Sequence, residues 1–529
     1  MILDDLDKHV RERPGERAVA ELSADGSVRE LTWAALKNES DRVAAELLRL
    51  AVREGEPVAF QLPNRLEFVT IALGTLRAGA VCEPLMPIFR ERELGFMLRE
   101  SGARVLFVPA VFRRRDYAAM AVSLRDTLPK LEHVVVLGDP TPTGTYQFGT
   151  GTYQAERERR QFPAVSDDQI AQLLFTSGTS GEPKGALHRH DALMRAADHH
   201  IEHFGLGPDD VIYAPSPLAH QTGFLYGMWI AIRLGATQVI QEAWDAELGL
   251  DAMRRFGVTF VQAATPFLAD LTRVAEDRDQ TPEQLRTFVA TGAAIPRELV
   301  RRAREILGAE VGGAWGTTES CLGCAFAPGD PPERAWGTDG RALAGVELRV
   351  ADDDDKPLAP GEEGNFQVHT DCLFVGYLNR PELSAEAVTA DGWYRTGDLA
   401  RIDPDGYVRI TGRVKDVITR GGEKVPVAEI EQLLHAHPAV RDVAIVAMPD
   451  ERLGERACAF VVGELDFDSM LQYLDSHRVS KTYWPERLEL VDTLPRTPSG
   501  KIQKFVLRAQ AREPQAPPSG AAENSLVST

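Results

Sequence analysis

Short β-branched runs alternate with segments able to form helices along most of the chain, and this alternation limits the possible folds most strongly. Residues 41–50 (DRVAAELLRL) predict an amphipathic helix, the apolar run EPVAFQL predicts a strand, and a further helix and strand follow up to Val108. The pattern returns in VIYAPSP, TQVIQE, VTFVQAA and LRTFVATGA. Strands separated by helices favour parallel sheets covered by helices. We therefore expect a large N-terminal α/β domain with parallel sheets.

The character of the sequence changes after Ala335. The segments GVELRVADDDD, KPLAPGEEGNFQV and ARIDPDGYVRITG are alternating strands broken by Asp, Pro and Gly, which predicts a small β-rich subdomain. The segment PVAEIEQLLHAHPAVRDVAIVAMPD predicts a helix and then a strand of a small α+β unit. We expect an N-terminal domain at 1–412, a C-terminal domain at 413–512 and a disordered, Pro-, Ser- and Ala-rich tail at 513–529.

Composition excludes several classes of function. The 529 residues include 59 Lys and Arg against 79 Asp and Glu, and a net charge of -20 argues against nucleic acid or an anionic membrane as the main partner. The sequence contains no apolar run of transmembrane length, and its acidic beginning does not resemble a signal peptide. With only five cysteines, a disulfide framework is not expected. We expect a cytoplasmic protein with reduced thiols, either a monomer or a homodimer.

The most informative segment is 173–185 (LLFTSGTSGEPKG), an apolar strand that enters a loop of glycines and small hydroxylated residues with one lysine. Glycines let backbone N–H groups approach phosphate oxygens, hydroxyls add donors, and Lys184 supplies a positive charge. The alternative is a flexible Gly/Ser surface linker. The Walker pattern is absent, so P-loop kinase or ATPase chemistry is not implied.

Further motifs follow this loop in order, and together they resemble the adenylate-forming superfamily of acyl-CoA synthetases, adenylation domains and luciferases. The resemblance covers essentially the whole chain and is closest to short- and medium-chain acyl-CoA synthetases and cyclohexanecarboxylate-type CoA ligases. The matching segments are 291–294 (TGAA), 315–319 (WGTTE), 394–398 (YRTGD), 412–416 (GRVKD) and 495–502 (PRTPSGKI).

The resemblance implies an enzyme, an acid–CoA ligase that forms AMP. ATP would activate a carboxylic acid as an acyl-adenylate with release of pyrophosphate, and the acyl group would pass to coenzyme A. Lys184 would hold phosphate, Glu319 would bind Mg²⁺, and Asp398 would accept hydrogen bonds from the ribose. Trp315 replaces the more usual Tyr and would stack on adenine. The implied ATP and AMP site comprises Thr176, Ser177, Gly178, Thr179, Ser180, Gly181, Lys184, Gly292, Ala293, Ala294, Trp315, Gly316, Thr317, Thr318, Asp398 and Arg413.

The same resemblance assigns roles to the C-terminal domain. Lys501 would be a catalytic lysine that bridges the carboxylate and the α-phosphate. The small domain would rotate about a hinge at Lys415 between the two half-reactions. After rotation the loop of Arg420, Gly421, Gly422, Glu423 and Lys424 would face the site and bind CoA, although a turn with no ligand remains an alternative.

The acid site is implied around 215–226 (PSPLAHQTGFLY), where His220 would lie beside the carboxylate. The implied pocket comprises His220, Gln221, Thr222, Gly223, Val311, Gly313 and Ala314, and its residues do not supply the acid and amine pair expected for an amino-acid substrate. The acid could be short- or medium-chain, alicyclic or aromatic. The acceptor could instead be an acyl carrier protein or a nitrogen nucleophile, and a non-catalytic ligand-binding paralogue is the remaining alternative.

Histidines and cysteines allow one further alternative. Cys321 and Cys324 with His369 and Cys372 have spacings that suit zinc, although the sequence does not indicate that the two pairs meet. The histidines between residues 188 and 203 predict a polar helix surface rather than a metal site.

Overall fold

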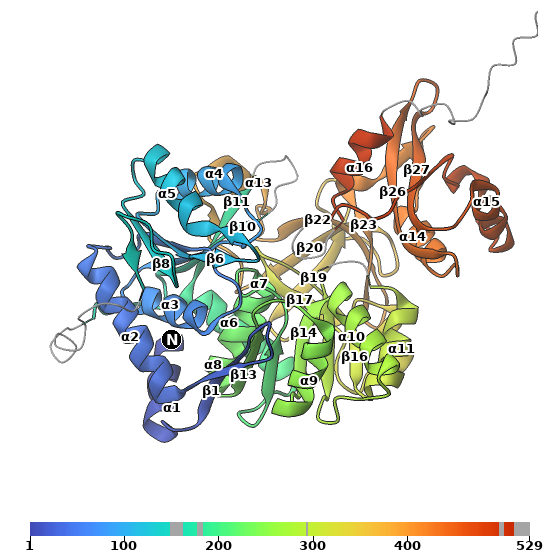
Figure 1. Ribbon diagram of the computed structural model, residues 1–529. Coiled ribbons are helices and arrows are strands. Elements are labelled where there is room, and N and C mark those ends of the chain that lie inside the picture. The colour runs from blue at the N-terminus through green and yellow to red at the C-terminus, as the bar shows by residue number, and fades with distance from the viewer. Residues whose placement is uncertain (149–161, 177–182, 293–294, 497–501, 513–529) are drawn as a thin grey trace, which may run out of the picture. The chain divides into compact units, whose positions relative to one another are not determined.

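The computed structural model describes residues 1–148, 162–176, 183–292, 295–496 and 502–512 (Figure 1). The chain divides into two compact units, a larger unit at Met1–Ile410 and a smaller unit that begins at Thr411. This division falls two residues before the predicted boundary, and the predicted tail at 513–529 lies outside the described residues.

The larger unit contains a nine-stranded sheet in which most neighbouring strands are parallel, as the β/α alternation predicts. Only the outer strands at its two edges run antiparallel. In spatial order the strands are β18 (Arg341–Ala342), β17 (Cys321–Ala325), β16 (Glu310–Thr317), β15 (Thr287–Thr291), β14 (Phe260–Ala264), β12 (Val211–Ala214), β13 (Thr237–Gln241), β1 (Arg17–Leu22) and β2 (Val28–Thr32).

A second, eight-stranded sheet of the larger unit is parallel from β10 to β9 and antiparallel where it continues into β11 and β21. In spatial order its strands are β21 (Gly376–Tyr377), β11 (Lys184–Arg189), β10 (Ile170–Thr176), β4 (Val81–Pro84), β3 (Pro57–Phe60), β5 (Val105–Pro109), β8 (His133–Leu137) and β9 (Tyr146–Gln147). A separate two-stranded ribbon joins β6 (Val111–Phe112) to β7 (Arg115–Asp116).

Helices cover both sheets. The long helices of the larger unit are α1 (Ile2–Glu12), α2 (Trp33–Arg49), α3 (Leu66–Arg77), α4 (Glu91–Ser101), α5 (Tyr117–Thr127), α6 (His190–Phe204), α9 (Ala246–Phe256), α10 (Thr265–Asp277) and α11 (Arg297–Leu307). The short ones are α7 (Gln221–Gly223), the π-helix η1 (Phe224–Trp229), α8 (Ile230–Leu234), α12 (Pro332–Gly337) and α13 (Pro381–Glu386). Side-chain caps fix several starts, as where Asp245 accepts the amide of Leu248 at the start of α9.

Three apolar clusters define the layers of the larger unit. One cluster buries α9, α10 and α11 against one face of the nine-stranded sheet, and these helices lie together in Figure 1. A second cluster joins the inner faces of both sheets through α2, α3, α6 and α8, and a third covers the eight-stranded sheet with α4 and α5. The core between the two sheets therefore fixes the carboxyl ends of their strands relative to each other.

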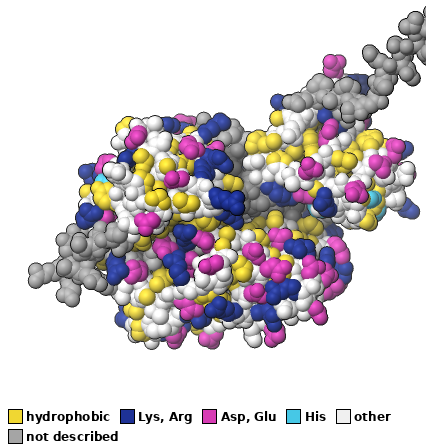
Figure 2. All heavy atoms as spheres, viewed as in Figure 1, with side chains coloured by type: hydrophobic (Ala, Val, Ile, Leu, Met, Phe, Trp, Pro, Cys, Tyr) yellow, Lys and Arg dark blue, Asp and Glu magenta, His cyan; other side chains and the backbone are white. Residues whose placement is uncertain are grey.

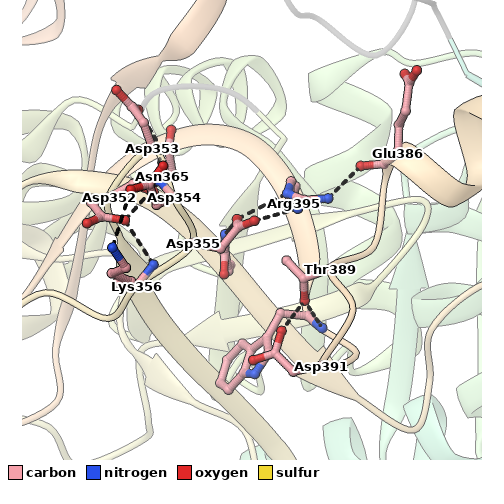
Figure 3. Close-up of polar contacts among 12 residues, drawn as sticks. Asp352, Asp353, Asp354, Asp355, Lys356, Asn365, Glu386, Thr389, Asp391 and Arg395 are labelled. Atoms are coloured by element: carbon pink, nitrogen blue, oxygen red, sulfur yellow. Dashed lines mark hydrogen bonds and ion pairs between the residues drawn. The ribbon is translucent and has the colours of Figure 1, made fainter.

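The β-rich subdomain is a four-stranded antiparallel sheet of β19 (Val346–Ala351), β20 (Gly364–Thr370), β22 (Tyr394–Ile402) and β23 (Val408–Arg413). Its acidic turn between β19 and β20 is tied to β22 by Arg395, whose Nε donates to Asp355 at 3.1 Å while Nη1 donates to the Glu386 carbonyl at 2.9 Å (Figure 3). Arg395 of the YRTGD segment is thus engaged in holding the subdomain together.

The smaller unit is an α+β structure with its own core. Its sheet contains β25 (Glu423–Val425), β24 (Ile418–Arg420), β27 (Gly454–Gly463), β26 (Val440–Asp450) and β28 (Arg487–Leu490). Its helices are α14 (Val427–His435), α15 (Phe467–Ser476) and α16 (Lys504–Ala511), with 3-10 turns η2 (Val414–Asp416) and η3 (Lys481–Tyr483). The predicted fold class, a large α/β domain with a β-rich subdomain and a small α+β domain, is confirmed.

The surface of the protein carries both signs of charge. Figure 2 shows lysines and arginines interspersed with aspartates and glutamates over the visible face. Among the described residues, helices that combine the length and apolarity needed to cross a bilayer are absent.

Candidate active site

Two antiparallel strands position the ends of the predicted phosphate loop. Thr176 closes β10, Lys184 opens β11, and the two residues are cross-strand partners, with the Thr176 hydroxyl 3.4 Å from the Lys184 carbonyl. The loop residues Ser177, Gly178, Thr179, Ser180 and Gly181 lie outside the described residues, as do Ala293 and Ala294. The strand pair therefore fixes where the loop leaves and re-enters the sheet.

A tight connection after β16 carries the WGTTE residues. A Cβ on Gly316 would lie 2.4 Å from the Cys321 carbonyl oxygen, so only glycine fits this approach. Cys321 itself adopts a left-handed φ of 59°, and Thr317 Oγ1 accepts the Ser320 amide at 3.1 Å. This closed turn presents Thr317, Thr318 and Glu319 next to one another.

Tyr377 brings the predicted phosphate lysine and the predicted magnesium ligand together. Its hydroxyl donates to Glu319 Oε1 at 2.8 Å, and Lys184 Nζ lies 5.0 Å from the centre of its ring. Burial, followed by the Glu319 charge, raises the pKa of Tyr377, so it stays a protonated donor. Lys184 and Glu319 are 135 positions apart in sequence and meet here through one ring.

His188 links the strand that begins with Lys184 to the turn that contains Thr318. Its Nε2 lies 2.7 Å from the Thr318 carbonyl oxygen, which can only accept, so the ring donates from Nε2. Full burial lowers the pKa of His188 to about 4, and the ring is neutral at physiological pH. The sequence did not indicate these roles for His188 and Tyr377. For His188 the available signal was its position three residues after segment 173–185.

Trp315 is placed beside the predicted ribose carboxylate. Its indole Nε1 donates to Asp398 Oδ2 at 2.8 Å, and its ring packs edge-on against Phe366 at 4.7 Å between centroids. Asp398 is buried, with its amide donating to the Thr396 hydroxyl at 3.0 Å. The tryptophan thus makes a polar contact of its own, which orients the carboxylate expected to meet the ribose.

Within the predicted acid segment 215–226, His220 caps α7. The Thr222 amide donates to His220 Nδ1 at 3.2 Å, so the neutral ring carries its proton on Nε2 and can donate there. Gln221 is buried, and its Nε2 lies 3.9 Å from Cys321 Sγ, beside the WGTTE turn. A π-helix follows at η1, a form common at functional sites.

The strand β16 separates the other predicted pocket residues. Val311 is fully buried in the cluster under α10 and α11, whereas Ala314 belongs to the cluster between the two sheets. Successive side chains of a strand alternate between faces, so Val311 and Ala314 face opposite sides. Gly313 shares the Val311 face, where Ile295 lies 3.0 Å from a Cβ built on it. Val311 and Gly313 therefore lie on the opposite face of β16 from Ala314, and their place in the pocket stays a prediction.

The smaller unit holds the remaining predicted residues. Arg413 ends β23, and Lys415 lies in η2, where its carbonyl accepts Arg508 Nη1 at 3.1 Å. Residues 420–424 form a hairpin in which Gly421 and Gly422 have φ of 58° and 94°, values that a tight two-residue turn requires. Arg420 pairs with Glu486 at 2.7 Å. The tight turn therefore explains why glycines occupy positions 421 and 422. Lys501 lies outside the described residues.

Glu319 fits a magnesium site. Mg²⁺ takes hard oxygen ligands and is commonly bound through one or two carboxylates together with substrate phosphates. Glu319 offers one buried carboxylate, oriented by Tyr377 and located beside Lys184 at the end of the phosphate-loop strands. Its carbonyl accepts the Phe374 amide at 2.8 Å, which fixes the backbone behind it.

The alternative zinc set is not brought together. His369 is engaged with Glu347 and Trp393 on the β-rich subdomain, while Cys372 Sγ lies 3.6 Å from His199 Nδ1. The prediction of a polar histidine surface is wrong for His188, His190 and His200, which are buried. His190 and His200 are buried because α6 packs between two sheets, and His188 is buried on the neighbouring strand β11.

Two protein-family models match the chain. A model of the AMP-binding enzyme family matches residues 6–378, and a model of the AMP-binding enzyme C-terminal domain matches residues 429–501. The chain therefore belongs to the AMP-binding enzyme family. With the nucleotide-site motifs on this fold, it is an adenylate-forming acid ligase that binds ATP.

Three relatives illustrate the range of this family. A medium-chain fatty-acid–CoA ligase of Escherichia coli strain K12 is 36% identical over 482 residues, which cover 90% of this chain and 85% of the relative. A salicyl-AMP ligase / salicyl-S-ArCP synthetase of Mycobacterium tuberculosis H37Rv is 35% identical over 516 residues, 96% of this chain and 90% of the relative. The crystal structure of the anthranilate CoA ligase AuaEII with anthranoyl-AMP matches at a TM-score of 0.86 and 27% identity, covering 96% and 97% of the two chains.

Proposed function

We propose that this enzyme joins a carboxylic acid to AMP, releases pyrophosphate, and then transfers the acyl group to coenzyme A. The observation that carries the proposal is the convergence of Lys184, Tyr377 and Glu319 at the end of the β10 and β11 strand pair. A lysine and a buried carboxylate that contact the same tyrosine suit a polyphosphate whose charge must be neutralised before a second anion can approach.

In the first half-reaction a carboxylate oxygen of the acid attacks the α-phosphorus of ATP, and the bond to pyrophosphate breaks. Lys184 offsets the phosphate charge, and Glu319 would hold Mg²⁺, which supplies further charge neutralisation when bound. Asp398, oriented by Trp315, accepts from the ribose hydroxyls. His220 donates from Nε2 toward the carboxylate of the acid, because its Nδ1 is occupied by the Thr222 amide.

In the second half-reaction the thiol sulfur of coenzyme A attacks the acyl carbonyl carbon, AMP leaves, and the thiol proton passes to solvent. We assign Lys501 to the first half-reaction and the hairpin of residues 420–424 to CoA binding, with the change between them occurring at Lys415. These assignments rest on the motif resemblance.

A second acceptor class is supported by one of the relatives. The Mycobacterium tuberculosis protein is named for both salicyl-AMP ligation and transfer to a carrier protein. The names of the relatives include a medium-chain fatty acid, salicylate and anthranilate. These acids support a substrate for this enzyme that either has no second charged group at neutral pH or contains an aromatic ring.

The test measures pyrophosphate release with ATP and Mg²⁺ over linear, alicyclic and aromatic acids, with and without CoA, and identifies products by mass spectrometry. We expect acid-dependent pyrophosphate and an acyl-CoA product, and Glu319→Gln should lower pyrophosphate release by about 100-fold because one metal-binding charge is lost. Formation of acyl-adenylate without acyl-CoA would reassign the acceptor. Pyrophosphate release that none of the acids increases would refute the proposal.

A further inference from the structure

A cluster of three potential metal ligands lies behind the WGTTE turn, where Cys321 Sγ is 3.8 Å from the Cys372 carbonyl oxygen. His199 on α6 meets Asp371 and Cys372, which follow β20, and one ligand atom from each lies within 4.8 Å of the others. Cys372 Sγ is 3.6 Å from His199 Nδ1 and 3.4 Å from Asp371 Oδ1. The imidazole thus comes from one element and the other two groups from a connection 172 positions later.

Two of the three separations, those from Cys372 Sγ, are those that a tetrahedral metal imposes. The ligand atoms of His199 and Asp371 lie up to 4.8 Å apart, so the exposed Asp371 side chain moves inward when an ion binds. With metal–sulfur bonds of about 2.3 Å and metal–nitrogen or metal–oxygen bonds of about 2.0 to 2.2 Å, neighbouring ligand atoms lie about 3.3 to 3.6 Å apart. Both measured separations from Cys372 Sγ agree with this. A thiolate and an imidazole favour Zn²⁺ or Co²⁺ over Mg²⁺, and Zn²⁺ also accepts a carboxylate oxygen.

Arg195 supplies the outer contact that orients the carboxylate. Its Nε lies 3.0 Å from Asp371 Oδ2, and its Nη2 donates to the Asp371 carbonyl at 3.0 Å, so Oδ1 is the oxygen that faces Cys372. The Asp371 side chain is 52% exposed, which provides an entry path, while Cys372 is only 2% exposed. A partner that fixes one oxygen and leaves the other directed at the cluster is typical of metal-binding carboxylates.

We propose that His199, Asp371 and Cys372 form a binding site for a divalent transition metal of the zinc type, with water in the fourth position. When the metal binds, a sulfur–metal bond forms and the Cys372 thiol releases its proton to solvent. The ion joins α6 to the segment after β20, whose Phe374 amide donates to the Glu319 carbonyl. The site is separate from the Mg²⁺ proposed at Glu319 and braces the backbone behind it.

The test titrates Co²⁺ into the chelator-treated full chain without ATP and follows absorption. We expect one equivalent to give a thiolate-to-cobalt charge-transfer band with tetrahedral visible bands, and Zn²⁺ to displace it. Cys372→Ser should abolish the charge-transfer band. Asp371→Asn keeps the shape of an exposed side chain and should weaken binding by about 10- to 100-fold.

Cys458→Ser is the matched control, because Cys458 is another buried free cysteine and lies in the smaller unit. Its spectrum should equal that of the unchanged protein. Cobalt binding without a thiolate band, or with a band and affinity unaltered in Cys372→Ser and Asp371→Asn, would overturn the proposal. Because Asp371→Asn does not alter a buried group, its result decides the matter even where Cys372→Ser fails to fold.

Discussion

At the scale of single residues, Glu83 is a buried acid whose charge the fold disfavours. It lies on β4 with its side chain fully buried, and among the described residues neither carboxylate oxygen has a hydrogen-bond partner. Burial raises its pKa to about 8, and the nearby Ser101 hydroxyl opposes this only weakly. Glu83 is therefore largely protonated in the folded protein at neutral pH.

This pKa makes the stability of the larger unit depend on pH. Between the usual glutamate value of 4.5 and about 8 the folded state holds more protons than the unfolded state, so the free energy of unfolding falls as pH rises. The loss is on the order of 3 kcal/mol by pH 7 and is complete above the folded pKa. Glu83→Gln should remove this part of the decline.

The measurement is urea unfolding of the unchanged protein and of Glu83→Gln at several pH values from about 5 to about 8.5. The variant should gain stability relative to the unchanged protein as pH rises. Glu333→Gln, which alters an exposed glutamate, should leave the pH dependence unchanged. If the free energy of unfolding changed with pH in the same way for Glu83→Gln and the unchanged protein, Glu83 would not be the cause of the pH dependence.

At the scale of elements, the site depends on how β11 is attached to the turn after β16. His188 makes this attachment through the Thr318 carbonyl, and it is fully buried. We predict that His188→Ala lowers kcat/KM for ATP-dependent pyrophosphate release by about 10- to 100-fold, because Thr318 and Glu319 lose their fixed distance from Lys184. His188→Gln, which retains a donor, should restore part of the loss.

His190→Ala provides the comparison. His190 is also buried and its pKa is likewise lowered to about 4 by burial, but it begins α6 and contacts Trp229 instead of the turn. We expect it to lower thermal stability with a smaller effect on kcat/KM. Equal activity losses in the two alanine variants, with no rescue by glutamine, would mean that His188 acts only through stability.

The sequence predicts the helices and strands better than it predicts which side chains of different elements are in contact. The β/α alternation suffices for the sheets and the order of motifs suffices for the family, because both are local signals. The contacts of Trp315 with Asp398 and of Tyr377 with Glu319 join positions 83 and 58 residues apart, and local patterns do not encode them. His190 and His200 were misjudged as surface residues, because their burial depends on the packing of two sheets around the helix layer that contains α6.

At the scale of the whole molecule, the two compact units correspond to a division of chemical labour that we propose. The larger unit contains the proposed phosphate, ribose and acid residues except Arg413. Arg413, Lys415 and the hairpin of residues 420–424 belong to the smaller unit. If the smaller unit serves each half-reaction with a different face, substitutions within it should separate the two steps. Substitution of a residue that acts in only one half-reaction would then leave the rate of the other half-reaction unchanged.

We predict that Lys501→Ala abolishes adenylate formation while sparing thioester formation from supplied acyl-adenylate, because a charge that bridges two anions is needed only in the first step. Lys415→Pro should do the reverse, because proline fixes φ and restricts the preceding residue, so rotation at η2 is hindered. Single-turnover assays of each half-reaction provide the measurement, with Lys481→Ala as a control in the same unit. If Lys501→Ala slowed both steps equally, or if Lys415→Pro left the CoA step unchanged, rotation about this position would have to be abandoned.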